Sequence, residues 1–146
     1  MMAKNAVKKK IVMYNPQPSP SMPYDGPPLA ILAAVALIEQ KEFDIKIIDW
    51  HYANFRTLLE KECSNAMVLG ITCMTGYQIK GMLEAAKLAK KLNPQIKVVV
   101  GGWHPTFEPE QTLRSKFIDF AYLNTDLNFS INYHLLSINF VWWHDP

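Results

Sequence analysis

The sequence has few of the residues that mark secreted, membrane-spanning or metal-binding chains. Among 146 residues there are two cysteines, Cys63 and Cys73, and no apolar stretch with a small-residue cleavage site stands near the amino terminus. A disulfide framework is therefore not expected, and the two cysteines lack the spacing of a metal site. The longest apolar run, residues 27–38, is too short to cross a bilayer. We expect a cytoplasmic protein with no membrane partner.

Charge is also scarce: 19% of the residues are charged and the net charge is +2. Much of the basic excess lies in Lys4, Lys8, Lys9 and Lys10. These lysines could form a patch for nucleic acid or anionic lipid, but no aromatic residue stands among them and no nucleic-acid motif follows. We interpret residues 1–9 as a solvated basic tail and expect no nucleic-acid partner.

No catalytic motif is present in the sequence. There is no nucleophile elbow, no P-loop, and no G-x-G-x-x-G after the first β-prone run, where a nucleotide site would need it. We therefore assign no catalytic residue and no metal ligand to this chain.

Hydrophobic periodicity divides the chain into alternating strands and helices. Five β-prone runs are separated by segments with helical spacing of apolar residues. The expected strands are residues 10–14, 43–49, 67–73, 96–100 and 117–122, and the expected helices are residues 27–40, 54–62, 78–92 and a short one from residue 109. The first helix is apolar nearly all round, so we expect it to be heavily buried.

This alternation predicts one α/β domain over residues 10–123. Strands that alternate with helices form parallel sheets with right-handed crossovers. We expect a doubly wound, five-stranded parallel sheet of order 2-1-3-4-5, as in flavodoxin-like and Rossmann-like domains. Residues 124–146 break the pattern, because apolar and polar residues alternate from Leu127 to Phe140. We expect strand or irregular structure there, not a closing amphipathic helix.

In such a sheet the ligand lies beside the carboxyl ends of the strands, at the switch point between strands one and three. Three loops meet there, and we expect the main hollow of the molecule among them. They offer backbone, hydroxyl groups and apolar side chains, which suit a large planar or polyamide-rich ligand. The candidate binding residues are Asn15, Pro16, Thr72, Met74, Thr75, Gly76, Tyr77, Gly101, Gly102, Trp103 and His104.

Three long stretches and two short pieces look like successive landmarks of one known domain over about residues 10–122. The long stretches are K-I-V-M-Y-N-P at residues 10–16, L-G-I-T-C-M-T-G-Y-Q at 69–78 and V-V-V-G-G-W-H-P-T-F-E-P-E-Q-T-L at 98–113, and the short pieces are Pro27-Pro28-Leu29 and Ile47-Ile48-Asp49. Together they resemble the amino-terminal cobalamin-binding domain of cobalamin-dependent radical S-adenosylmethionine proteins. The magnesium-protoporphyrin monomethyl ester cyclase type and related methylases are the most similar in these motifs.

The resemblance implies a cobalamin cofactor lying on the carboxyl edge of the sheet, with the candidate residues above as its contacts. In full-length relatives a radical S-adenosylmethionine domain follows, with an iron–sulfur cluster on C-x-x-x-C-x-x-C. That motif is absent here, and the family's R-G-x-G-E is replaced by Leu123-Asn124-Thr125-Asp126. The chain then resembles a fragment or truncated form of a methylase or cyclase, whose radical domain or subunit would be its partner.

Two other interpretations stay open. The chain could be a degenerate, truncated domain that binds nothing, which the unusual residues 124–146 favour. It could also be a response-regulator-like signalling domain, which shares the strand order. That class needs acidic residues after strand one and a lysine after strand five, where this chain has Asn15-Pro16 and Leu123-Asn124.

The segment Asp49-Trp50-His51-Tyr52-Ala53-Asn54 nearly spells D-x-H-x-x-G, a motif whose histidine ligates cobalt in another class of cobalamin proteins. It departs from that motif at the glycine position, and it follows the second expected strand instead of the first. We therefore expect His51 to be an ordinary loop residue and not a cobalt ligand.

Overall fold

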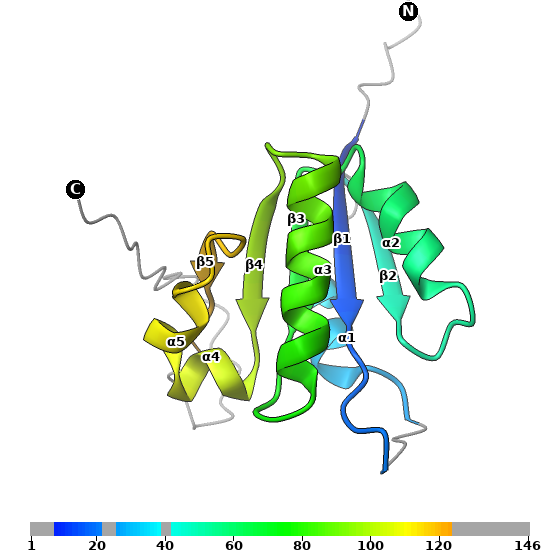
Figure 1. Ribbon diagram of the computed structural model, residues 1–146. Coiled ribbons are helices and arrows are strands. Elements are labelled where there is room, and N and C mark those ends of the chain that lie inside the picture. Colours follow the sequence, from blue (N-terminus) through cyan, green and yellow to red (C-terminus); the bar gives the residue numbers. More distant parts are fainter. Residues whose placement is uncertain (1–7, 22–25, 39–41, 124–146) are drawn as a thin grey trace, which may run out of the picture.

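Figure 1 shows the computed structural model of the chain, which describes residues 8–21, 26–38 and 42–123, as one twisted sheet with helices on both faces. Strands and helices alternate along these residues. The elements are β1 Lys9–Asn15, α1 Leu29–Ala36, β2 Phe43–Asp49, α2 Phe55–Cys63, β3 Val68–Thr72, α3 Gln78–Leu92, β4 Lys97–Gly101, α4 Trp103–Phe107, α5 Pro109–Leu113 and β5 Phe120–Ala121.

The five strands pair in the order β2-β1-β3-β4-β5, and every pair is parallel. The predicted fold class and strand order are confirmed. β5 is shorter than the expected residues 117–122. Just before β5, the backbone N–H of Val98 in β4 donates to the side-chain carboxylate of Asp119 over 2.7 Å. This side chain takes the place of the backbone carbonyl that would extend the pairing of β4 with β5.

The main core lies between the sheet and the pair α2 and α3, which cover the same face (Figure 1). Alternate residues of each strand point to this face, among them Val12, Leu69 and Val98, all with no exposed surface. The facing side of α3 is built from Met82 and three alanines. Small side chains let the helix axis approach the sheet closely, so the core is dense with few bulky groups.

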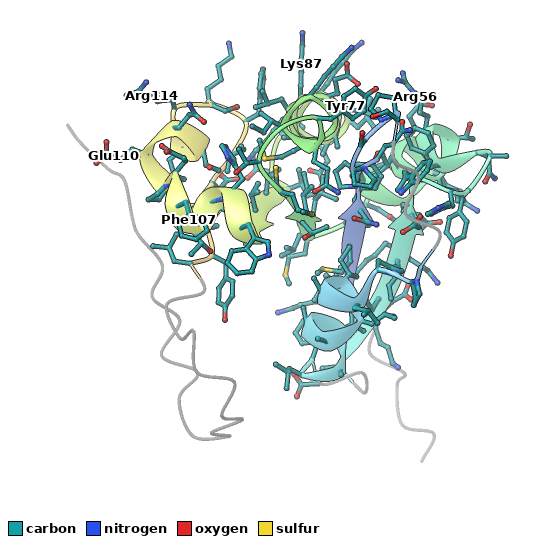
Figure 2. All side chains as sticks on the ribbon, turned by 90° about the horizontal axis from the view of Figure 1, so that it is seen from below. Arg56, Tyr77, Lys87, Phe107, Glu110 and Arg114 are labelled. Atoms are coloured by element: carbon teal, nitrogen blue, oxygen red, sulfur yellow. The ribbon has the colours of Figure 1, made fainter. Side chains whose placement is uncertain are left out.

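The opposite face carries α1, and here the expectation of a heavily buried helix over residues 27–40 is wrong. The helix is shorter, and Ile31 and Val35 are its buried residues. Leu29, Leu32 and Leu37 are exposed. A helix can press one stripe onto a sheet, and burial of its other sides needs a second neighbour. The described residues place no second helix beside α1, as Figure 2 makes plain.

None of the described helices is long and apolar enough to cross a membrane. The expectations for residues 1–7 of the basic tail and for residues 124–146 concern segments outside the described residues. Lys8 and Lys9, at the end of the expected tail, are exposed.

Asp119 joins β4, α3 and the approach to β5 by charge-assisted bonds. Its carboxylate accepts from Val98 N–H and lies 2.7 Å from the Lys90 ammonium and 3.6 Å from that of Lys97. Burial alone would raise the pKa of this carboxyl group, but the hydrogen bonds from Lys90 and Val98 outweigh it and hold the pKa below its usual value.

We expect Asp119→Asn to lower the free energy of unfolding at neutral pH by about 2 kcal/mol, because bonds to a charged acceptor are lost. The folded-state pKa is lowered, so the stabilisation is present above the unfolded value and is lost as pH falls through the folded value. Urea unfolding at about pH 7 and about pH 3 should show the difference from wild type shrinking in acid. The control is Asp44→Asn, which breaks an exposed pair with Lys46 and should cost well under about 1 kcal/mol. A difference that stays constant with pH would contradict this account.

Candidate functional site

Because all strands are parallel, their carboxyl ends and the following loops meet at one edge of the sheet, the lower edge in Figure 1. A chain of hydrogen bonds joins three of these loops. The buried side chain of Gln78 accepts from Met74 N–H over 2.7 Å and donates to Pro16 O over 2.6 Å and to Asn15 Oδ1 over 3.4 Å. Asn15 Nδ2 donates to Asp49 Oδ2 over 2.9 Å. We call Asn15, Asp49, His51 and Gln78 the edge network.

His51 belongs to this network through Asp49, whose Oδ1 accepts from the His51 backbone N–H and contacts ring atom Nδ1. Burial of Asp49 raises the pKa of its carboxyl group, but the bonds from Asn15 and His51 outweigh burial and lower it below its usual value. Asp49 is therefore ionised at neutral pH and fixes one side of the imidazole. His51 lies in the loop after β2, as expected from the sequence.

The loops after β3 and β4 are held against each other by backbone bonds. Cys73 N–H donates to Gly101 O over 2.8 Å, and His104 N–H donates to Cys73 O over 3.0 Å. Gly102 lies between them with φ 103° and ψ −166°, a region that L side chains rarely enter. A Cβ on Gly102 would lie 2.8 Å from Cys73 O and 3.2 Å from Thr72 Oγ1. Glycine is required there both by its backbone angles and by the closeness of the neighbouring loop.

Exposed apolar side chains collect on this edge. Trp103 and Phe107, one turn apart on α4, are stacked with ring centroids 5.6 Å apart and are 55% and 64% exposed. Met74 and Tyr77, from the loop after β3, are also exposed. Figure 2 looks onto this edge from below, with Phe107 on the α4 side and Tyr77 near α3. Exposed apolar side chains at a switch-point edge are what a binding site would offer, so this edge stays the candidate site.

The eleven candidate residues thus lie at one edge, but their side chains differ in access. Met74, Thr75, Gly76, Tyr77 and Trp103 are exposed; Asn15, Thr72, Gly101 and Gly102 are half-buried; Pro16 and His104 are buried. The structure describes no ligand, so their role in binding stays a prediction. Trp103 and His104 begin helix α4, which the sequence analysis had taken as loop. Pro105 is tolerated in that first turn because its missing N–H would have no partner there.

Two candidate side chains are buried below this edge. His104 is 1% exposed, and its Nδ1 has no partner among the described residues. This position suits a packing role better than contact with a ligand at the surface. Cys73 is fully buried, and burial raises the pKa of its thiol to about 12. The thiol is therefore protonated at neutral pH, and a protonated thiol is a poor nucleophile.

Two grooves of the structure lie away from the hollow that was expected among the three loops. A groove of about 430 Å³ lies between α2 and α3, and a second of about 450 Å³ lies between α1 and β2. Of the eleven candidates, Tyr77 alone lines either of them. At the edge itself, the loops after β3 and β4 are bonded to each other through the backbone of Cys73.

Sequence reasoning missed Gln78, Asp49 and Phe107 as parts of this edge. The sequence analysis placed Gln78 at the start of a helix, and no sequence pattern predicts that a buried side-chain amide will bridge two loops. Asp49 could have been found, since it ends an expected strand beside Asn15 in the predicted sheet order. Within the described residues, no group of three or more histidine, cysteine or acidic side chains could hold a metal ion.

Comparison with known proteins agrees with this fold. A family model described as the B12 binding domain matches residues 21–125. An uncharacterized methyltransferase of Pyrococcus horikoshii is 36% identical over 94 residues, which are 61% of this chain and 20% of that protein. The crystal structure of a cobalamin-binding protein from Desulfitobacterium hafniense has the same fold, with a TM-score of 0.51 and 16% identity over 74% of this chain and 50% of that one. The chain therefore spans a fifth of the curated relative and half of the solved one.

The close approach at Gly102 predicts a difference between two glycines with similar φ. Gly102→Ala should lower the free energy of unfolding by about 3 kcal/mol, since a strained backbone and a collision with Cys73 add up. Gly76 has φ 105° but nothing within 4 Å of an added Cβ, so Gly76→Ala should cost about 1–2 kcal/mol. Urea denaturation of both variants measures this. Equal losses would show that the contact with Cys73 carries no weight.

Proposed function

The chain belongs to the B12-binding domain family, and on this premise we propose that it binds cobalamin across the carboxyl edge of its sheet as the cofactor-carrying module of a larger enzyme. The proposal rests chiefly on one observation. The edge at the switch point between β1 and β3 combines exposed apolar side chains with loops fixed by backbone and amide hydrogen bonds.

The residues at this edge fit a corrinoid. A corrin ring is large, flat and mostly apolar, with amide side chains at its rim, so it needs apolar contact area and hydrogen-bonding groups together. Met74, Tyr77 and Trp103 would supply contact area. The hydroxyls of Thr72 and Thr75 would bond to rim amides.

Glycine backbone at three positions would let the ring lie close to the loops. These positions are Gly76, Gly101 and Gly102. Asn15 and Pro16 would bound the site on the β1 side, where the edge network holds them in place. His104 would support the loop from beneath.

A bound corrinoid supplies radical or alkyl-transfer chemistry at its cobalt, whereas the residues here bind and orient it. The described part of the chain contains no catalytic constellation, and the sequence contains no C-x-x-x-C-x-x-C motif. The match to a fifth of a protein named as a methyltransferase supports a parent enzyme with further domains. We propose a radical S-adenosylmethionine methylase or cyclase as that parent, with the radical domain or subunit as partner, on the resemblance of the three motif stretches.

The test is retention of hydroxocobalamin by the chain after incubation and desalting, read from the absorbance spectrum. We expect wild type to retain the cofactor and Trp103→Ala to bind it about tenfold more weakly, because an exposed aromatic contact is lost. Tyr52→Ala is the matched control, since Tyr52 is also an exposed aromatic residue but lies after β2. If wild type retains no cobalamin, the chain is the degenerate, non-binding domain. If both variants weaken binding equally, the site is misplaced.

We further expect cobalamin to bind base-off and without histidine coordination. His51 follows β2 and is turned toward Asp49 through Nδ1, and His104 is buried. His51→Ala should therefore leave the absorbance spectrum of bound cobalamin unchanged. A changed spectrum in this variant, at unchanged occupancy, would instead make His51 a cobalt ligand.

A further inference from the structure

The groove between α2 and α3 lies on the face opposite α1 and has no part in the cobalamin site proposed above, apart from a shared wall at Tyr77. Its floor is apolar. Phe55 and Leu59 line it from α2, and Ala85 and Leu88 line it from α3. In Figure 2 the labelled side chains of Arg56, Tyr77 and Lys87 lie beside these two helices, away from Phe107.

The groove is elongated. Its α3 wall contains Gly81, Ala85 and Leu88, which follow one another at spacings of four and three residues and so form a single stripe along the helix. Lys91 extends the lining by one more turn, so the wall runs for about 15 Å. A small planar ligand would use one end of such a trough. A helix laid along it would use its whole length.

The rim of the groove is basic. Four cations and two carboxylates line it: Arg56, Lys80, Lys87 and Lys91 against Glu60 and Glu84. Arg56 lies 3.8 Å from Glu84 across the groove. The three lysines have no ion-pair partner among the described residues. A net excess of two positive charges favours an acidic partner, and the two carboxylates disfavour a nucleic acid, whose phosphates would lie beside them.

Trp50, at the carboxyl end of the groove, adds an unsatisfied donor. Its indole N–H is buried and meets no acceptor among the described residues. A buried donor without an acceptor is costly and uncommon in native proteins. This nitrogen has almost no accessible surface, so a partner in the groove would contact the apolar floor and the basic rim and not this donor.

We propose that the groove between α2 and α3 docks an amphipathic helix whose apolar stripe is flanked by acidic residues, supplied by a neighbouring domain. The matched methyltransferase is about five times as long as the matched segment, so related proteins contain ample further chain to provide it. The apolar stripe would lie over Leu59, Ala85 and Leu88. The acidic flanks would face Lys80, Lys87 and Lys91.

The experiment uses the full chain and three fluorescein-labelled synthetic helical peptides of about 18 residues, followed by fluorescence anisotropy at low salt. One peptide has an apolar stripe with glutamate flanks, one has the same composition in scrambled order, and one has lysine flanks. We expect the first to bind at least about tenfold more tightly than the others, because stripe and charge must both match.

Variants locate the contact. Lys87→Glu should weaken binding of the acidic peptide about fivefold to tenfold, and Glu84→Gln should tighten it. Lys116→Glu is the matched control, since it reverses an exposed lysine after α5, outside the groove, and should change nothing. Circular dichroism checks that each variant is folded, and retention of hydroxocobalamin should be equal in all three variants, which separates this proposal from the cobalamin site.

Three results would overturn the proposal. Equal binding of the scrambled acidic peptide would show attraction of charge without docking of a stripe. Equal weakening by Lys87→Glu and Lys116→Glu would show that the groove is not the site. Binding of the aromatic anion anilinonaphthalene sulfonate that is sensitive to Lys87→Glu, with no binding of the acidic peptide, would make the groove a small-molecule site instead.

Discussion

The placement of β1 between β2 and β3 is the constraint on which the rest of the structure depends. β1 pairs in parallel with β2 through all seven of its residues and with β3 through four. Parallel pairing requires each crossover to return the chain to the same starting edge, so every loop that leaves a strand meets the others at the carboxyl edge. The reversal of strand order at β1 then sends the chain to opposite faces after β1 and β3, and the edge at this switch point is the one that we propose as the cobalamin site.

Hydrogen bonds between the loops at the carboxyl edge hold these loops in fixed positions. Gln78 spans the loops after β1 and β3, and the backbone of Cys73 joins the loops after β3 and β4. Preorganised loops lose little conformational freedom on binding, so more of the interaction with a flat cofactor is retained as affinity. Trp103 and Phe107 are exposed at this edge and are not part of the main core.

The two faces of the sheet are covered to different extents. The α2–α3 face contains the main core, and its outer surface forms the basic groove at Lys80, Lys87 and Lys91. The α1 face is thinly covered within the described residues, with leucines of α1 exposed. The proposed cobalamin site at the edge and the proposed docking groove on the α2–α3 face use separate residues except for Tyr77.

The order of elements was determined by the sequence itself, because apolar runs such as residues 67–73 and the helical spacing of residues 78–92 record local periodicity. The glycines at residues 101 and 102 likewise predicted a close approach of backbone at a strand end, which the structure shows between Gly102 and Cys73. The burial of each helix face and the bonds between loops depend on residues far apart in the sequence, so only the tertiary structure decided them. The all-apolar sequence of α1 did not reveal that Ile31 and Val35 would be buried while Leu29 and Leu32 stay exposed, and nothing local marked Gln78 as the bridge between two loops. The groove between α2 and α3 arises where two helices far apart in sequence lie side by side, so its charges come together only in the folded chain.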